Sequence, residues 1–563
     1  MLLGLILLPP LAAEVASTSS SSATTTLPNI VLILTDDQRS DTLGTPGAAL
    51  PNIQSELMDH GISFSNSFVV NSLCCPSRSS ILTGKYSHTT GVYKNEMPNG
   101  GYKSFNATST VATWLHGAGY RTGLIGKYLN GYKTANAATI PPGWDRWFVL
   151  AQGKTDTESA YYLNYSVSDQ GALVSYGGTD ADYSTDVFAS QADSFIRTTS
   201  GSQPLFLELA TAAPHSPATP PSRYSTSFST LTPYRPPNYN EADVSDKPAY
   251  IRALSKLGSS ARSNIDAFRI NQYRTLLGVD DAVGKVVQAL QDTGRLANTM
   301  IVFYSDNGLT WAEHRWKKGK LVPYEESIRV PLVIRYDPYT QSPGSTDAHP
   351  VTNIDLAPTF AELAGVTAPG AEGTSLMPLI TGTSTGWRTD LLIEHLQGTD
   401  PVPSFCAVRN EQYMFATYGT GEQELYDLSA DPYELTNQIA NPSYAGTASS
   451  LRARDQQLCT PVPPGFAFDK TPPSTPTGLT ATTPSSTEVD LSWTASTDNI
   501  GVTGYTIYRD GNVIGTVSGS TLSFPDTTVS PGTTYTYTVD AFDLNENHSP
   551  QSDPVSVTTP SGP

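Results

Sequence analysis

The sequence predicts an α/β domain followed by an all-β module, and two observations support this. Three apolar runs, residues 29–34, 204–210 and 300–304, are dominated by aliphatic and aromatic residues, as in strands buried on both faces of a sheet. Beyond residue 473, short alternating strands are separated by turn signals, which is typical of a β-sandwich. A Pro-rich stretch, residues 461–473, lies between the two patterns and indicates a linker.

Length and charge narrow the classes of function. The chain has 563 residues, enough for two or three domains, and 38% hydrophobic with 15% charged residues indicates a globular protein. Lys and Arg number 33 against 52 Asp and Glu, so the net charge is −19. This argues against nucleic acid as a partner, because phosphate binding requires basic patches. An anionic substrate must therefore be held by a few local cations.

The first residues are similar to a secretion signal. An apolar run, residues 2–8, is followed by small residues and by a Ser/Thr tract that reaches residue 26, the order of a signal peptide and a flexible spacer. No later apolar run is long enough to span a membrane. We therefore expect a secreted protein without a membrane span.

Oxygen-bearing side chains follow two of the predicted strands. Asp36 and Asp37 come after the first apolar run, and Asp306 and Asn307 come after the third. Ligands of open α/β sheets gather beyond the carboxyl ends of the strands. An all-oxygen set suits Ca²⁺ or Mg²⁺ and suits zinc poorly. The alternative is two unrelated turns or helix caps.

The segment of residues 74–84, Cys-Cys-Pro-Ser-Arg-Ser-Ser-Ile-Leu-Thr-Gly, organises the rest of the chain. Pro76 suits a first helical position, and Gly84 suits the residue just past a helix end. A group on Cys74 is then expected to face free backbone N–H donors, a natural place for an anion. The non-functional alternative is a buried cysteine pair at a helix start.

Cys-x-Pro-Ser-Arg followed by Leu-Thr-Gly resembles the signature of the type I, formylglycine-dependent sulfatases. The resemblance implies an alkaline-phosphatase-like sulfatase fold, with a large mixed sheet between helices and a small antiparallel C-terminal subdomain. It implies that host formylglycine-generating machinery oxidises Cys74 to an aldehyde, whose hydrate is the nucleophile. It also makes Arg78 a catalytic residue. The calcium of the family, with Mg²⁺ as an alternative, is expected on Asp36, Asp37, Cys74, Asp306 and Asn307.

Three further segments resemble sulfatase elements in the same order along the chain. Lys127 corresponds to a sulfate-contacting lysine, but the histidine that many members carry two residues later is Leu129 here. His215 corresponds to the active-site histidine that binds sulfate and donates a proton. The pattern Lys-x-x-x-Tyr-Glu selects Lys320. Four neighbours complete the candidates: Lys317 and Lys318 as alternatives to Lys320, and His314 and Asn130 as substrate-binding residues.

The C-terminal third shows two all-β patterns. Residues 404–427 alternate in polarity and predict antiparallel strands, and the strings at 424–428 and 431–434 resemble the closing subdomain of sulfatases. Beyond the linker, Trp493 supplies a core residue, and residues 531–539 resemble the tyrosine corner of a fibronectin type III module.

Four cysteines are few for a secreted chain of this size. Cys74 and Cys75 are adjacent and cannot easily pair with each other, so Cys406 and Cys459 remain as the candidate disulfide. The predicted division of the chain comprises a signal peptide and spacer (1–26), a catalytic domain (27–390), an antiparallel subdomain (391–460), a linker (461–473) and a fibronectin type III module (474–560).

These features predict a secreted sulfuric ester hydrolase. Residues 74–78, 126–130 and 141–145 are most similar to the N-acetylglucosamine-6-sulfatase and arylsulfatase branch, which implies a sulfated sugar or aryl sulfate as substrate and relates the protein to glycosaminoglycans. The fibronectin module is a candidate contact for polysaccharide or a surface. Two alternatives stay open: a phosphonate or phosphodiester hydrolase of the same superfold, and a non-catalytic secreted binding protein.

Overall fold

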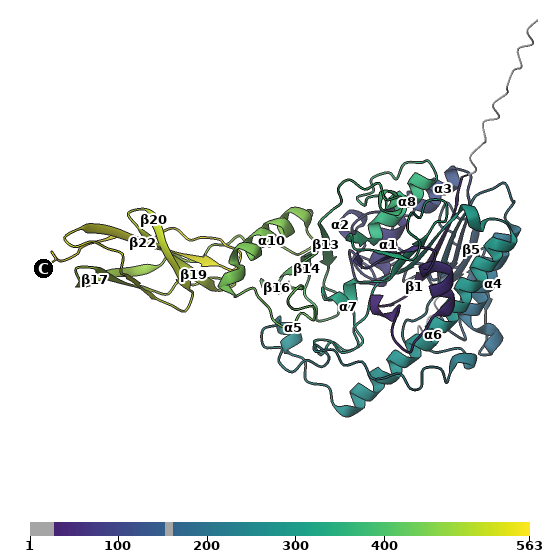
Figure 1. Cartoon of the computed structure of the whole chain (residues 1–563), viewed down its shortest axis with the longest axis horizontal. Coiled ribbons are helices and arrows are strands. Elements are labelled where there is room, and N and C mark those ends of the chain that lie inside the picture. Colours follow the sequence, from purple (N-terminus) through teal and green to yellow (C-terminus); the bar gives the residue numbers. More distant parts are fainter. Residues whose placement is uncertain (1–26, 152–160, 563) are drawn as a thin grey trace, which may run out of the picture.

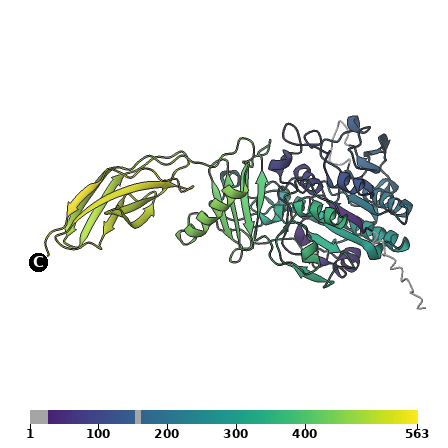
Figure 2. The same ribbon diagram turned by 90° about the horizontal axis from the view of Figure 1, so that it is seen from above.

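The computed structural model describes residues 27–151 and 161–562. The predicted signal peptide and spacer, residues 1–26, lie outside the described residues. Three parts follow one another along an elongated molecule: a large α/β domain, a small sheet with one helix, and a β-sandwich at the C-terminus (Figures 1 and 2). No helix among the described residues combines the length and the apolar character needed to cross a membrane.

A ten-stranded mixed sheet forms the centre of the large domain. The strands β9, β1, β8, β4 and β5 lie side by side and run parallel, and antiparallel pairs flank them on both sides. The mixed sheet between helices that the sequence predicted is confirmed. In spatial order, its strands are β11 (Ser345–Asp347), β2 (Ile62–Phe64), β10 (Leu332–Arg335), β9 (Thr299–Ser305), β1 (Asn29–Thr35), β8 (Leu205–Ala210), β4 (Arg121–Gly126), β5 (Arg146–Leu150), β6 (Ser166–Asp169) and β7 (Ala172–Ser175).

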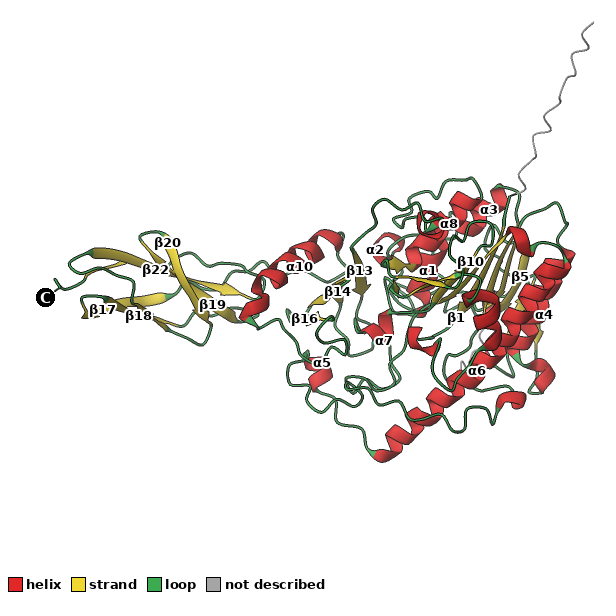
Figure 3. Ribbon diagram, viewed as in Figure 1, coloured by secondary structure: helices red, strands yellow, loops and turns green. Residues whose placement is uncertain are grey.

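Helices cover both faces of this sheet because its central strands are apolar on both sides. Val31 and Ile33 of β1 pack with α4 and α6 in one core, whereas Ile30 and Leu32 pack with α1, α3 and α8 in another. Successive strand residues point to opposite faces, so one continuous apolar run serves both layers (Figure 3). The helices of the large domain are α1 (Cys74–Thr83), α2 (Ser87–Thr90), α3 (Val111–Gly117), α4 (Ser184–Thr198), α5 (Ala249–Arg252), α6 (Ser259–Asp292), α7 (Glu325–Ile328), α8 (Leu356–Leu363) and α9 (Met377–Ile380).

A four-stranded antiparallel sheet follows the large domain. One face packs against helix α10 (Ala445–Leu458), and the other face packs against residues of the large domain. A disulfide joins Cys406 to Cys459 and so ties the second strand to the end of α10. The strands are β13 (Asp390–His395), β14 (Phe405–Asn410), β15 (Tyr413–Tyr418) and β16 (Gln423–Asp427); a separate two-stranded sheet is formed by β3 (Ser67–Phe68) and β12 (Val351–Thr352).

Asp455 in α10 makes the stability of the protein depend on pH. Burial raises the pKa of its carboxyl group to about 8, so the folded chain keeps a proton that the unfolded chain releases above about pH 4. The contribution of this group to stability is therefore greatest below this pH and falls by about 1.4 kcal/mol per pH unit up to about pH 8. We expect Asp455→Asn to raise the melting temperature at pH 8 and to change it little at pH 4. The exposed Glu411→Gln should show no such difference in parallel thermal melts.

The C-terminal module is a two-sheet sandwich. Its core contains Trp493, Tyr505 and Tyr537, and the hydroxyl of Tyr535 accepts a hydrogen bond from the Ser530 amide at 2.9 Å, which closes the predicted tyrosine corner. Gln423 of β16 donates to Asn545 at 2.6 Å and so links the sandwich to the small sheet. One sheet consists of β17 (Thr477–Ser485), β18 (Glu488–Thr494) and β21 (Ser523–Asp526), and the other of β20 (Asn512–Ser518), β19 (Val502–Arg509), β22 (Thr534–Asp543) and β23 (Val555–Thr558).

Candidate active site

Two neighbouring strands bring four oxygen-bearing side chains to one edge of the sheet. Strands β1 and β9 are parallel and adjacent, with Thr35 opposite Ser305, so the residues that follow them meet. The Asp37 amide donates to Asp306 Oδ1 at 3.1 Å, and Asn307 Nδ2 donates to Asp37 Oδ1 at 2.7 Å. Asp37 has a φ of 64°, an uncommon conformation for a residue other than glycine that often accompanies function.

Helix α1 begins at Cys74 and not at Pro76, which corrects the start predicted from the sequence. Pro76 is the third helical residue; it is tolerated because amides in a first helical turn have no intrahelical partner. Gly84 ends the helix with a φ of 69°, a conformation that suits glycine. The Cys75 amide, also in the first turn, donates to Asn95 Oδ1 at 2.9 Å.

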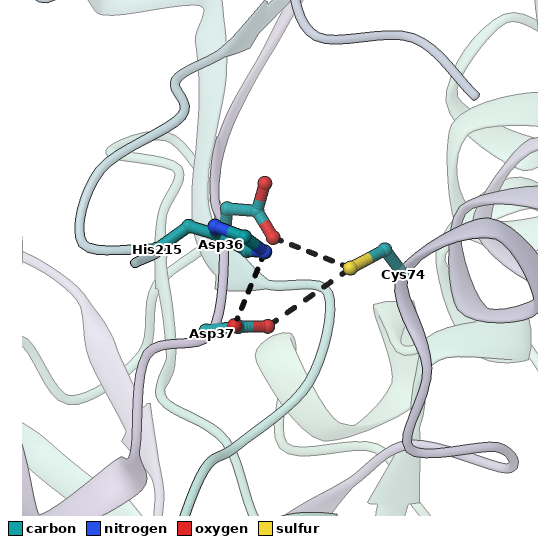
Figure 4. A group of neighbouring side chains, drawn as sticks. All are labelled: Asp36, Asp37, Cys74 and His215. Carbon is teal, nitrogen blue, oxygen red and sulfur yellow. Dashed lines mark hydrogen bonds and ion pairs between the residues drawn. The ribbon is translucent and has the colours of Figure 1, made fainter. Parts of the chain in front are cut away.

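Side chains from three segments converge at the N-terminus of α1 (Figure 4). The Sγ atom of Cys74 lies 3.5 Å from Asp36 Oδ1 and 4.0 Å from Asp37 Oδ1. His215, from the loop after β8, places Nε2 3.6 Å from Asp37 Oδ2. Cys74 and both aspartates are buried, and the four residues together form a group that fits a metal ion.

Two lysines from distant positions in the sequence reach the same group. Lys127, just after β4, forms an ion pair with Asp36. Lys320, from the loop before α7, forms an ion pair with Asp37 and places Nζ 2.8 Å from the Sγ atom of Cys74. Because opposite charges neutralise each other at short range, the carboxylates hold both cations next to Cys74.

Arg78 supplies a third cation from the first half of α1. Its Nε donates to Asp306 Oδ2 at 2.7 Å, and its Nη1 donates to the carbonyl of Lys127 at 2.9 Å. Its Nη2 lies 3.7 Å from Asp36 Oδ2 and has no hydrogen-bond partner. A buried guanidinium with an unused donor has the charge and geometry to bind an additional oxyanion.

Charge and burial act in opposite directions on the acidic groups. Burial alone would raise the pKa of Asp36, but Lys127 and the neighbouring cations lower it to about 2. The pKa of Asp37 is likewise lowered, because Lys320 and His215 outweigh the effect of burial. Burial raises the pKa of the Cys74 thiol well above its ordinary value despite the two lysines. The carboxylates are thus ionised, whereas an unmodified thiol at this position stays protonated and is a weak nucleophile.

The donor set fits a hard divalent cation. Asp36, Asp37, Asp306 and Asn307 offer oxygen atoms, and Asn307 Oδ1 is buried without a hydrogen-bond partner. A buried orphan acceptor beside ionised carboxylates is costly unless a donor or a cation satisfies it. Oxygen ligands of this kind are those that Ca²⁺ and Mg²⁺ prefer.

The other sequence candidates lie differently. His314 is fully buried, with Nδ1 2.7 Å from Glu241 Oε2. Its polar contacts are with Glu241 and Asn238 and not with Cys74. Asn130 has a buried side-chain oxygen without a hydrogen-bond partner. Lys317 and Lys318 are exposed, and Leu129 is buried in the apolar core.

Two residues that shape the site carry no local signal in the sequence. The ring of Tyr161 lies 5.3 Å from the His215 ring and 5.6 Å from Lys127 Nζ, so it forms one wall of the site. Asn95 anchors the first turn of α1. Neither residue belongs to a recognisable motif, and only the folded chain brings them to the site.

Cys74 is buried away from solvent, between three cationic side chains and a cluster of carboxylates. This arrangement is typical of a hydrolase that acts on anionic esters. Comparisons with known proteins agree. Residues 28–366 match the family model Sulfatase, residues 312–460 match N-sulphoglucosamine sulphohydrolase, C-terminal, and residues 474–558 match the fibronectin type III domain.

Individual relatives cover most of the chain. N-acetylglucosamine-6-sulfatase from Homo sapiens is 33% identical over 499 residues, which cover 78% of this chain and 88% of the human protein. The extracellular sulfatase SULF-1 homolog from Drosophila melanogaster is 35% identical over 65% of this chain and 33% of its own length. A solved structure described as a complex with its substrate, D-glucosamine-2-N,6-O-disulfate, has a TM-score of 0.67 and 25% identity, covering 77% of this chain and 97% of that chain.

The chain therefore belongs to the sulfatase family. It is an enzyme, a sulfuric ester hydrolase, with a fibronectin type III domain at its C-terminus. The resemblance predicted from the sequence is confirmed, and the alternative of a non-catalytic binding protein is set aside.

Proposed function

We propose that this enzyme releases sulfate from a sulfated sugar of the N-acetylglucosamine-6-sulfate kind, with Cys74 converted to formylglycine and a divalent cation, Ca²⁺ or Mg²⁺, on the neighbouring oxygens. The observation that carries the proposal is the convergence of Cys74 with Asp36, Lys320 and the other charged groups in one buried site. The similarity to an N-acetylglucosamine-6-sulfatase and to a structure with a sulfated glucosamine supports the substrate class. Aryl sulfates are expected to serve as simpler substrates.

The environment of Cys74 supports the proposal that its thiol is converted to another group before catalysis. Its thiol pKa is raised by burial, so the thiolate is scarce at neutral pH. A hydrated formylglycine would supply two hydroxyls on one carbon, one to attack sulfur and one to expel sulfate afterwards. Lys320, 2.8 Å from Sγ, favours the deprotonated form of any hydroxyl at this position by its charge.

Residues around the nucleophile position have complementary roles. A divalent cation held by Asp36, Asp37, Asp306 and Asn307 would supply Lewis-acid polarisation. Arg78, with an unused Nη2 donor, binds and orients an oxygen of the sulfate. Lys127 and Lys320 neutralise the charge that develops on the sulfate oxygens in the transition state. The carboxylates of the three aspartates also hold these cationic side chains in place before substrate arrives.

We assign to His215 the protonation of the leaving alcohol. Its Nδ1 donates to the Ser216 carbonyl at 2.7 Å, which leaves Nε2 as the ring atom that gains and releases a proton. Nε2 faces the carboxylate of Asp37 at 3.6 Å, and Tyr161 packs edge-on against the ring. The histidine therefore has a defined tautomer and orientation, as general acid catalysis requires.

The proposal extends to the place where the enzyme acts and to its partners. We propose that it is secreted, as the N-terminal sequence and the similarity to an extracellular sulfatase suggest. Formylglycine-generating machinery of the host is its required partner. The fibronectin domain, which lies at the far end of the molecule from helix α1 (Figure 1), is proposed to contact polysaccharide or a surface. Asn130 and His314 stay proposed as residues that influence substrate binding.

Sulfate release tests the proposed function directly. Purified enzyme should release sulfate from N-acetylglucosamine-6-sulfate and from an aryl sulfate, measured by ion chromatography. Its kcat/KM on an aryl phosphate diester or a phosphonate monoester should be far lower. Efficient turnover of the phosphorus esters without sulfate release would favour the phosphonate or phosphodiester hydrolase of the same superfold.

Lys320→Ala should lower kcat on an aryl sulfate by about 10²-fold, because a charge contact to the transition state is lost. Stopped aryl sulfate assays measure this loss. Lys317→Ala, three residues earlier on the same loop, is the matched control and should keep wild-type turnover. Equal losses in the two variants would remove Lys320 from its assigned role.

A further inference from the structure

The loop of residues 312–321 carries lysine side chains that point in two different directions. Five of its residues other than glycine have φ values between 44° and 91°: Ala312, His314, Arg315, Lys318 and Leu321. Such conformations cost free energy and persist where the surrounding structure enforces them. As a result, Lys320 reaches inward to Cys74, whereas Lys317 and Lys318 lie on the outside of the loop.

A groove runs along the outside of this loop. It consists of two hollows of about 510 Å³ and 610 Å³ that share Gly258, Ala261 and Lys317 as lining residues. Trp316 and Lys256 line the first hollow, and Lys318 lines the second. The shared residues make the two hollows one continuous surface, which we call the lysine groove.

The lysine groove is cationic in a chain with a net charge of −19. Within the described part of the chain, Lys256, Lys317 and Lys318 form no ion pair with a carboxylate, although Lys318 Nζ lies 4.7 Å from the Phe268 ring. By contrast, Lys127 and Lys320 in the active site are both paired. Cations left without an ion-pair partner in an acidic protein create a local field that attracts anions.

The lysine groove adjoins the active site. The Trp316 indole, which lines the groove, donates to the Lys320 carbonyl at 3.2 Å. Three residues separate Lys317 from Lys320, so their Cα atoms are at most about 11 Å apart. The other wall belongs to α6, whose long axis runs from the lower edge of the domain up to the large sheet (Figure 3). The active site and the lysine groove therefore lie on two sides of the same short loop.

We propose that the lysine groove binds a second anionic group, a sulfate or a carboxylate, on the same saccharide chain whose sulfate ester lies at Cys74. This inference rests on the proposed function and deepens it: the preferred substrate is a polyanionic oligosaccharide and not an isolated sulfated monosaccharide. Trp316 offers an aromatic wall on which a sugar ring packs. Lys256, Lys317 and Lys318 supply the charge, each through a partly hydrated contact that is screened by salt.

Kinetics with two substrates test the inference. The Lys317→Ala/Lys318→Ala enzyme is compared with wild type on an aryl sulfate and on a sulfated glucosamine–uronate hexasaccharide. We expect KM for the hexasaccharide to rise about tenfold in the variant, the combined effect of two exposed charge contacts, with kcat unchanged. Aryl sulfate kinetics should not change. The KM of wild type for the hexasaccharide should also rise more steeply with salt than that of the variant.

A matched control and a binding measurement separate the two proposals. Lys285→Ala/Lys470→Ala removes the same charge from exposed positions outside the groove and should behave as wild type. Hexasaccharide binding to Cys74→Ala enzyme, with and without the groove substitutions, gives the affinity without turnover. Unchanged KM and unchanged affinity in the groove variant, or an equal loss on aryl sulfate, would overturn the groove proposal. Groove-dependent binding with no sulfate release by wild type would instead overturn the proposed function alone.

Discussion

Replacing Cys74 by alanine is expected to lower kcat on an aryl sulfate by roughly 10⁴-fold or more, the scale seen when an enzyme loses its covalent nucleophile. The variant keeps the cations that bind sulfate, so the substrate should still bind. No other described side chain lies in the same position between Asp36, Asp37 and Lys320. Steady-state kinetics measure the loss, and peptide mass spectrometry across residue 74 of the native enzyme identifies the group that Cys74 becomes.

Cys75 provides the control for this experiment. It is adjacent to Cys74 and equally buried, but its side chain packs in the apolar core with residues such as Ile81. Cys75→Ala should therefore reduce stability and leave kcat close to wild type. An unmodified thiol at position 74 in fully active enzyme would contradict the formylglycine proposal, because the enzyme would then act without the aldehyde.

Removing the cation is expected to have the second largest effect. Chelation should lower kcat by about 10²-fold or more, since the charge stabilisation of the transition state is lost, and added Ca²⁺ or Mg²⁺ should restore it. The melting temperature should rise with the free cation concentration, because a ligand at 100 times its Kd stabilises the folded state by about 2.7 kcal/mol. Elemental analysis should find one cation per chain.

Asp37→Asn separates metal binding from general effects of charge. The substitution removes a ligand that also contacts Lys320 and Asn307, so both the bound cation and its effect on the melting temperature should disappear. Asp59→Asn, at an exposed position of the same domain, should retain both. Full activity of a chelated, metal-free enzyme would contradict the proposed role of the cation.

Much of the site was predictable because its residues occur in local patterns. The apolar run before Asp36 and the run before Asp306 each signal a buried strand, and polar residues after a buried strand mark a sheet edge. The segment that begins at Cys74 combines a motif with a helix end at Gly84, although the helix starts two residues earlier than Pro76 indicates. First-turn proline is compatible with either start, so local propensity did not distinguish them.

Other assignments depended on contacts that no local pattern encodes. Lys317, Lys318 and Lys320 have similar sequence surroundings, and the positive φ values of the loop decide that Lys320 alone contacts Cys74. His314 follows an acidic residue in sequence, but Glu241, distant in the chain, holds it in a buried network. Tyr161 belongs to the site through the edge-on contact of its ring with the His215 ring.

By itself, the sequence determined the class of fold, the order of the motifs and the chemistry available to them. Buried strands, helix ends and turns follow from the spacing of apolar residues, glycine and proline, which act over a few positions. The tertiary structure alone decided which groups meet, as when Lys320 contacts Asp37 across 283 positions. It also separated the inward Lys320 from the outward lysine groove. Long-range contacts depend on strand register and on loop conformations that the surrounding structure enforces. No short segment of the sequence determines either of them.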